Sequence, residues 1–124
     1  MTEYFERTKR LAETIFDGSR AYIGECTLVY FMDWNGIQYR FNPFISIGDA
    51  MRLADELVKT HEVEFYLFYK ADTETNKAYR KNSGWVAEVR PLGNAPVFRE
   101  NSNFACEAIC YAIEAYLDNL VGVL

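Results

Sequence analysis

The residues best suited to binding chemistry are basic and aromatic side chains in the stretch KADTETNKAYRKNSG, residues 70–84. This stretch holds four basic residues against two acidic ones, in a chain of 124 residues whose formal net charge is −5. Lys77, Arg80 and Lys81 surround Tyr79, and cations beside an aromatic ring suit a phosphate or carboxylate group. The alternative is a long polar hairpin tip that binds nothing.

Two further arginines, Arg90 and Arg99, can join this patch if the segments that carry them lie close together. Such a pocket predicts a binder of an anionic small molecule, for example a nucleotide signal. Tyr79 or Trp85 would then supply the surface on which a base stacks.

Carboxylates and the single histidine are the candidates for acid and base catalysis. Glu62 and Glu64 share one face of an expected strand, and Glu88 and His61 are the other candidates. A solvated strand edge is the favoured explanation of the paired glutamates, and no nucleophile motif accompanies the histidine. A carboxylate-based enzyme is therefore only the second alternative, and we expect no catalytic residues.

The cysteines and glycines indicate neither a metal site nor a phosphate-binding loop. Cys106 and Cys110 share a helical face with alanine and isoleucine, which is typical of core packing, and Cys26 is expected to pack as well. A zinc site needs about four close ligands, so we expect no metal and no cofactor. An odd number of cysteines and no apparent signal peptide predict a protein of the reducing cytosol, that is, a cytoplasmic protein.

Composition limits the partners. Thirteen basic residues stand against 18 acidic ones, which opposes binding to a nucleic-acid backbone and offers no basic membrane anchor. The longest apolar run, residues 27–32, is too short to span a bilayer. Half of the residues are apolar, so residues 1–124 are expected to form one domain with its own core.

Hydrophobic periodicity predicts three helices and four strands. The expected elements are a helix over 2–17, strands on either side of Asn35-Gly36, a helix over 47–59, strands over 61–70 and 85–91, an irregular segment over 92–101 and a helix over 102–120. This α-ββ-α-ββ-α order predicts an α+β fold. We expect one antiparallel four-stranded sheet with helices on both faces, an α/β/α sandwich.

The turn at Asn35-Gly36 sets the register of the first hairpin, because a type I′ turn needs positive φ at both positions. That register places six apolar residues on one core-facing side: Tyr30, Met32, Trp34, Ile37, Tyr39 and Phe41. Ser46 is expected to cap the helix over 47–59, with Asp49 as its capping-box acid, and Met51 and Val58 to be buried on that helix.

The second face of the expected sheet is also apolar, with Val29, Phe31, Tyr66, Phe68 and Val86 on it. Such a face needs a cover. Either the first helix packs on it, or it is an interface with a protein partner or another copy of the chain. In the second case Phe31, Tyr66 and Phe68 are the candidate interface residues.

Three short motifs within roughly residues 42–115 carry a family resemblance: FNPFISIGDAM before a helix, GWVAEV as a strand, and ACEAICYAIEA as an alanine-rich helix. With them the chain resembles the phage ABA sandwich family, small proteins of phages and prophages. The resemblance implies an α/β/α fold and a phage origin, and it implies no biochemical function or catalytic residue.

From these observations we expect a small, non-catalytic phage or prophage accessory protein that binds a host or phage protein. Counter-defence is one setting for such a protein. The absence of catalytic motifs and the abundance of tyrosine favour a binding role, since tyrosine and arginine are over-represented at interfaces.

Overall fold

The computed structural model describes residues 2–25, 29–70, 84–93 and 95–123, and it places them in three helices and two sheets. In chain order the elements are α1 (Thr2–Ile15), β1 (Arg20–Ile23), β2 (Tyr30–Trp34), β3 (Ile37–Arg40), α2 (Ile47–His61), β4 (Val63–Lys70), β5 (Gly84–Pro91), β6 (Phe98–Ser102) and α4 (Ala105–Val123). The chain therefore runs twice through a helix and three strands before α4. Nowhere in these ranges is a helix both long and apolar enough to cross a membrane.

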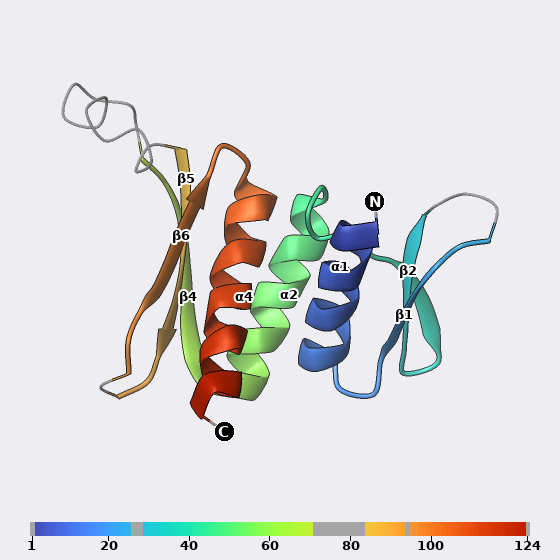
Figure 1. The fold of residues 1–124 in the computed structure, drawn as a ribbon, viewed down its shortest axis with the longest axis horizontal. Helices are drawn as coiled ribbons and strands as arrows, with labels where there is room; N and C mark the ends of the chain where they lie inside the picture. Colours follow the sequence, from blue (N-terminus) through green and yellow to red (C-terminus); the bar gives the residue numbers. More distant parts are fainter. Residues whose placement is uncertain (1, 26–28, 71–83, 94, 124) are drawn as a thin grey trace.

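The two sheets lie on opposite sides of the molecule, and the helices fill the space between them (Figure 1). Each sheet is antiparallel with its strands in chain order, β1-β2-β3 and β4-β5-β6. Helix α1 packs on β1, α2 on β4, and α4 on β5 and β6. The α+β class is confirmed. The single four-stranded sheet with helices on both faces was wrong, because the sheets form the outer layers and the helices the inner one.

Two short strands that the sequence analysis missed account for this difference. β1 is only four residues long, and four of the five residues of β6 fall in the segment 92–101 that was expected to be irregular. The sequence of β6, FRENS, lacks the apolar alternation that marks a strand. Each missed strand adds a third member to one hairpin, so the two hairpins belong to separate sheets.

The turn at Asn35-Gly36 forms as predicted, with φ of 54° and 78° at its two residues. It pairs Trp34 with Ile37 and Met32 with Tyr39. Met32 is fully buried and Trp34 packs against the core, whereas Ile37 is mostly exposed, so of the pair beside the turn only Trp34 contributes to the core.

Helix α2 begins at the predicted cap, where Asp49 N donates to Ser46 Oγ at 3.3 Å. The Asp49 carboxylate instead accepts from the backbone N of Asn42 at 2.9 Å, so it ties the preceding loop to the helix. The helix ends at Glu62, whose φ of 51° is left-handed. Met51 and Val58 are 41% and 40% exposed, so their predicted burial was wrong.

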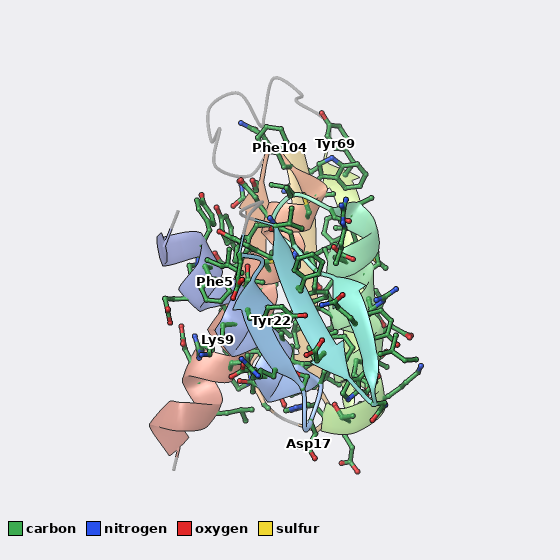
Figure 2. The ribbon with its side chains drawn as sticks, turned by 90° about the vertical axis from the view of Figure 1, so that its right-hand side faces the viewer. Phe5, Lys9, Asp17, Tyr22, Tyr69 and Phe104 are labelled. Atoms are coloured by element: carbon green, nitrogen blue, oxygen red, sulfur yellow. The ribbon has the colours of Figure 1, made fainter. Side chains whose placement is uncertain are left out.

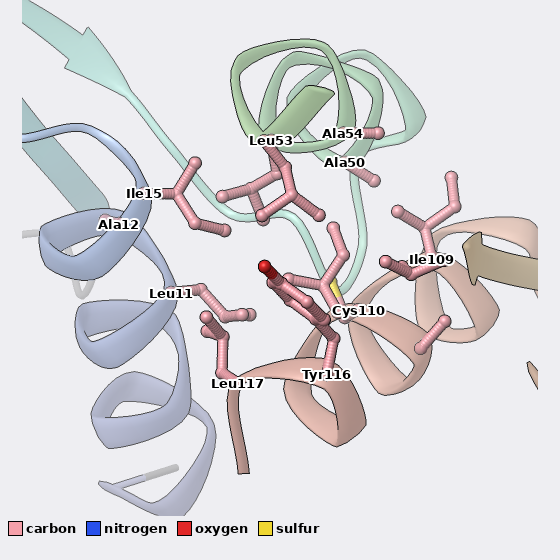
Figure 3. Packing of buried hydrophobic residues seen from close by; sticks show 14 of the residues in the cluster. Leu11, Ala12, Ile15, Ala50, Leu53, Ala54, Ile109, Cys110, Tyr116 and Leu117 are labelled. Carbon is pink, nitrogen blue, oxygen red and sulfur yellow. The ribbon is translucent and has the colours of Figure 1, made fainter. Parts of the chain in front are cut away.

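The hydrophobic core lies where the three helices meet. Figure 3 shows it built from Leu11, Ala12 and Ile15 of α1, Ala50, Leu53 and Ala54 of α2, and Ile109, Cys110, Tyr116 and Leu117 of α4. Small residues at the α2–α4 contact let the two helices approach closely. The inner faces of both sheets complete the core, with Met32 on one side and Ala87 and Val89 on the other.

One arginine joins α1 to α4 beside this core. Arg7 Nε donates to Glu114 Oε2 at 2.8 Å. Hydrogen bonding to Glu114 raises the pKa of Arg7. The guanidinium carbon also lies 4.6 Å from the ring centroid of Phe44, 5.3 Å from that of Tyr111 and 5.6 Å from that of Tyr4. Arg7 thus ties the first helix to Tyr111 and Glu114 of the last helix and to Phe44 in the segment before α2.

Candidate interaction surface

The sheet β4-β5-β6 has an inner face on the helices and an outer face turned away from them. Val63, Ala87 and Val89 belong to the core, so the residues that alternate with them point outward. We call this outer side the arginine face, formed by Glu64, Tyr66, Phe68, Lys70, Val86, Glu88, Arg90, Arg99 and Asn101.

At the centre of the arginine face, one buried carboxylate binds two arginines. The side chain of Glu88, on the middle strand β5, has no exposed surface. Arg90 Nε and Nη2 lie 2.8 and 2.7 Å from Glu88 Oε2. Arg99 Nε lies 2.7 Å from Glu88 Oε1, which Arg99 Nη2 also contacts. Each arginine is therefore held at two nitrogens by one oxygen.

Burial by itself would raise the pKa of Glu88, because an apolar environment disfavours the charged form. The hydrogen bonds and charges of Arg90 and Arg99 outweigh that effect and lower the pKa. Glu88 is consequently a carboxylate at neutral pH and accepts hydrogen bonds only. This state suits an anchor for cations and does not suit a general acid.

Exposed aromatic rings lie beside the two arginines. The Arg90 guanidinium carbon is 4.4 Å from the ring centroid of Tyr66, whose hydroxyl donates to Glu64 Oε2 at 2.7 Å. That hydrogen bond raises the pKa of Tyr66. Tyr66 and Phe68 remain 39% and 40% exposed. Tyrosine, phenylalanine and arginine are enriched at interfaces, and here all three share one side of one sheet.

A hollow of about 100 Å³ lies over Val86, lined also by Phe68, Lys70, Arg99 and Asn101. Pockets for small ligands begin at roughly 300 Å³, so a nucleotide does not fit in it. A single carboxylate or phosphate group does, with two cationic side chains in the lining.

The structure describes only part of the predicted basic patch. Lys77, Tyr79, Arg80 and Lys81 lie outside the described residues. Arg90 and Arg99 are brought together by the pairing of β5 with β6, which places Arg99 directly opposite Glu88. Their role in binding stays a prediction.

The predicted interface residues do not form one surface, because Phe31 lies on the other sheet. There the outer side of β1-β2-β3, which we call the tyrosine face, is formed by Arg20, Tyr22, Phe31, Asp33, Gln38 and Arg40. Figure 2 looks onto this side, with Tyr22 on β1 labelled. Tyr22 stacks on Phe31 with 5.6 Å between ring centroids. Tyr66 and Phe68 therefore belong to a different face from Phe31.

The other candidates for chemistry are not assembled into one site. His61 Nδ1 lies 3.2 Å from the hydroxyl of Tyr116, and burial lowers the pKa of His61. Glu62 ends α2 in the left-handed conformation, whereas Glu64 accepts from Tyr66 on the arginine face.

The two described cysteines are unpaired thiols, and Cys110 is fully buried while Cys106 is partly exposed. Burial raises the pKa of Cys110. Cys26 lies outside the described ranges. Within those ranges, no three His, Cys, Asp or Glu residues lie together in a way that could hold a metal ion.

Sequence reasoning missed the role of Glu88 as the residue that fixes Arg90 and Arg99. The signal was a single carboxylate inside the otherwise apolar start of the strand GWVAEVRP. A charge between apolar neighbours on a strand is often partly buried, and a buried charge needs partners.

No protein-family model matches this chain, and neither a curated protein nor a solved structure matches it. The resemblance to the phage ABA sandwich family therefore stays a prediction.

Proposed function

We propose that this chain is a non-catalytic binding protein and that it holds a partner protein on the arginine face. The observation that carries the proposal is the pair of surface arginines fixed by the fully buried Glu88. Arg99 keeps 61% of its side chain exposed while two of its nitrogens are tied to Glu88. A cation that is already ordered loses less side-chain entropy when a partner binds.

The chemistry of the face specifies the kind of segment that fits. Its three cations, Lys70, Arg90 and Arg99, outnumber its two carboxylates in a chain with an overall charge of −5. The hollow beside Arg99 admits a carboxylate, and the exposed ring of Phe68 offers apolar contact next to it. We therefore expect a partner segment in which an acidic residue lies close to an apolar one.

A random peptide library tests this proposal with matched variants on the two faces. Peptides selected on the wild-type chain should combine Asp or Glu with a neighbouring large apolar residue. Phe68→Ser and Arg99→Ser should each weaken their binding by roughly thirtyfold, the effect of losing a central interface residue. The controls Phe31→Ser and Arg20→Ser change the same residue types on the tyrosine face and should leave binding intact.

Selection of no peptide would contradict the proposal. So would peptides whose binding survives both arginine-face substitutions while far-ultraviolet circular dichroism shows that the variants are folded.

A phage origin, a role in counter-defence and the capture of a nucleotide signal rest on the sequence alone. The hollow favours a partner side chain over a nucleotide because of its size. A thermal-shift screen separates the two ligand classes, since a nucleotide at 100 times its dissociation constant would add about 2.7 kcal/mol to the stability of the folded state.

A further inference from the structure

Strand β4 is the longest edge strand that the structure describes. It has eight residues, whereas the edge strands β1 and β3 have four each and β6 has five. No described strand pairs with the second edge of β4. Alternate backbone N–H and C=O groups of an antiparallel strand point to that side, so the edge offers a row of hydrogen-bonding groups.

The sequence of β4 lacks the devices that usually block such an edge. β6 is short and carries adjacent charges at Arg99 and Glu100. β4, VEFYLFYK, contains no proline and has charges only at Glu64 and Lys70, near its two ends. The residues between them are apolar or aromatic on both faces, and Tyr69 is 61% exposed. An edge of this kind favours pairing with another strand.

We infer that a second copy of this chain pairs with β4 in antiparallel fashion and joins two three-stranded sheets into one of six strands. The inference does not rest on the proposed partner binding. The occupant is the chain itself, because β4 is complementary to its own reverse.

The complementarity fixes the register. If the helices of both copies lie on the same side, inward residues must face inward residues across the new contact. A two-fold axis through Leu67 then places Glu64 opposite the partner's Lys70 on the outer face. The same axis places Tyr66 opposite the partner's Phe68, and Phe65 opposite the partner's Tyr69. Opposite charges and aromatic pairs in these positions stabilise antiparallel strands.

Moving the two-fold axis by one residue, from Leu67 to Tyr66, loses this match. With Tyr66 on the axis, Glu64 faces the partner's Phe68, and Lys70 can meet only the partner's Glu62. Glu62 has a left-handed backbone, with φ of 51° and ψ of 51°, so it is not part of the strand. The axis through Leu67 is therefore the register that pairs both charged ends within β4.

Helix α2 supplies a second apolar surface that the same contact would cover. Leu53 points into the core between the three helices, and Ala54 lies on the side of α2 nearer α4 (Figure 3). Successive residues of a helix are about 100° apart around its axis. On α2, three apolar residues therefore point roughly 20–60° further around the axis than Ala54, on the side away from Leu53. They are Ile47, Met51 and Val58, all at least 40% exposed. Since α2 packs on β4, the α2 helices of two copies paired along β4 would be neighbours on one side of the joined sheet.

Charge reversal with sedimentation equilibrium tests the inference on the full chain. The wild type should form a dimer with twice the mass of one chain. Glu64→Lys alone places lysine opposite lysine, and Lys70→Glu alone places glutamate opposite glutamate. Because each contact occurs twice, either change should raise the dimer dissociation constant by about tenfold. The double variant restores opposite charges and should return the constant close to that of the wild type.

A cysteine pair tests the register independently of charge. Directly opposed residues in antiparallel strands have Cα atoms about 4.5–5.5 Å apart, within the span of a disulfide. Leu67→Cys should therefore give a covalent dimer on mild oxidation. Phe65→Cys, two residues away on the same side of β4, faces the partner's Tyr69 and should give far less.

Two results would overturn the inference. One is a wild type that stays monomeric over the whole concentration range that its solubility allows. The other is a dimer that responds to neither charge reversal and does not cross-link through Leu67→Cys, which would place the contact elsewhere.

Discussion

The arginine face and the tyrosine face both carry arginine, tyrosine, phenylalanine and carboxylate side chains, but only the first buries a carboxylate. On the tyrosine face, the exposed Asp33 accepts from the hydroxyl of Tyr22 at 3.2 Å, and Gln38 Nε2 donates to that hydroxyl. On the arginine face, Glu88 is fully buried. Exposed contacts compete with water and salt, whereas a buried carboxylate must keep its partners. The comparison shows how one buried acid can order the cations of a surface.

Position along the strand explains the difference. Glu88 lies in the middle of an eight-residue strand that has a neighbour on each side. Asp33 also belongs to a middle strand, but it is the second-last residue of a five-residue strand and lies beside the turn at Asn35-Gly36. Side chains of neighbouring strands surround the first carboxylate, and water reaches the second.

The largest expected effect comes from removing one charge on each face. Glu88→Gln leaves a single amide oxygen for two arginines and places an NH₂ group against one of them. We expect it to lower the free energy of unfolding by about 2 kcal/mol, the usual size of a hydrogen bond to a charged group. Asp33→Asn should change it by less than about 0.5 kcal/mol. Urea denaturation measures both, and equal losses would remove the distinction between the faces.

Lowering the pH should reveal the contribution of the Glu88 carboxylate to stability in the wild-type protein. The folded state lowers the pKa of Glu88, so its stabilising effect is present above the unfolded-state pKa of about 4.3 and is lost as the pH falls through the folded-state value. The free energy of unfolding of the wild type should therefore decline more steeply below about pH 4 than that of Glu88→Gln.

Removing one arginine from each face should have a smaller effect. Arg99→Ala takes away one of two partners of Glu88, and we expect a loss of about 1 kcal/mol in the free energy of unfolding. Arg20 lies over the Tyr22 ring at 5.7 Å on the exposed tyrosine face. Arg20→Ala should therefore leave stability within about 0.5 kcal/mol of the wild type. A larger loss for Arg20→Ala would mean that the tyrosine face is ordered by its own cation.

The smallest expected effect concerns the exposed hydrogen bonds of the tyrosine face. Tyr22→Phe removes the hydroxyl that links Asp33 and Gln38 but keeps the ring that stacks on Phe31. Its free energy of unfolding should fall by less than about 0.5 kcal/mol, since water replaces exposed hydrogen bonds. Thermal unfolding at low and high salt provides the measurement. A loss comparable to that of Glu88→Gln would contradict the view that burial decides the difference.

The sequence predicts the local structure well, because local signals specify it. The helices, the Asn35-Gly36 turn and the strands β4 and β5 follow from periodicity and turn chemistry. The arrangement of the two hairpins could not be predicted without β1 and β6. In the absence of these two strands, each hairpin had only the other hairpin to pair with in a sheet. The sequences RAYI and FRENS are short or polar, and tertiary packing makes them strands.

The candidate surface was predictable only in part. Arg90 and Arg99 were singled out, but as members of a basic patch with residues 77–81 and without Glu88. Recognising that Glu88 holds them requires knowing that β6 pairs with β5, which places Arg99 opposite Glu88. No local pattern in the sequence indicates that pairing.

The central position of α2 has a consequence for how the molecule opens. Arg52 of α2 lies over the ring of Tyr39 on β3 at 4.8 Å, while the same helix packs on β4, α1 and α4. Because α2 contacts both other helices and β4, the amide hydrogens of its buried face should be among the slowest to exchange with solvent. A ligand on the arginine face would then slow amide exchange behind the tyrosine face on the opposite side of the molecule.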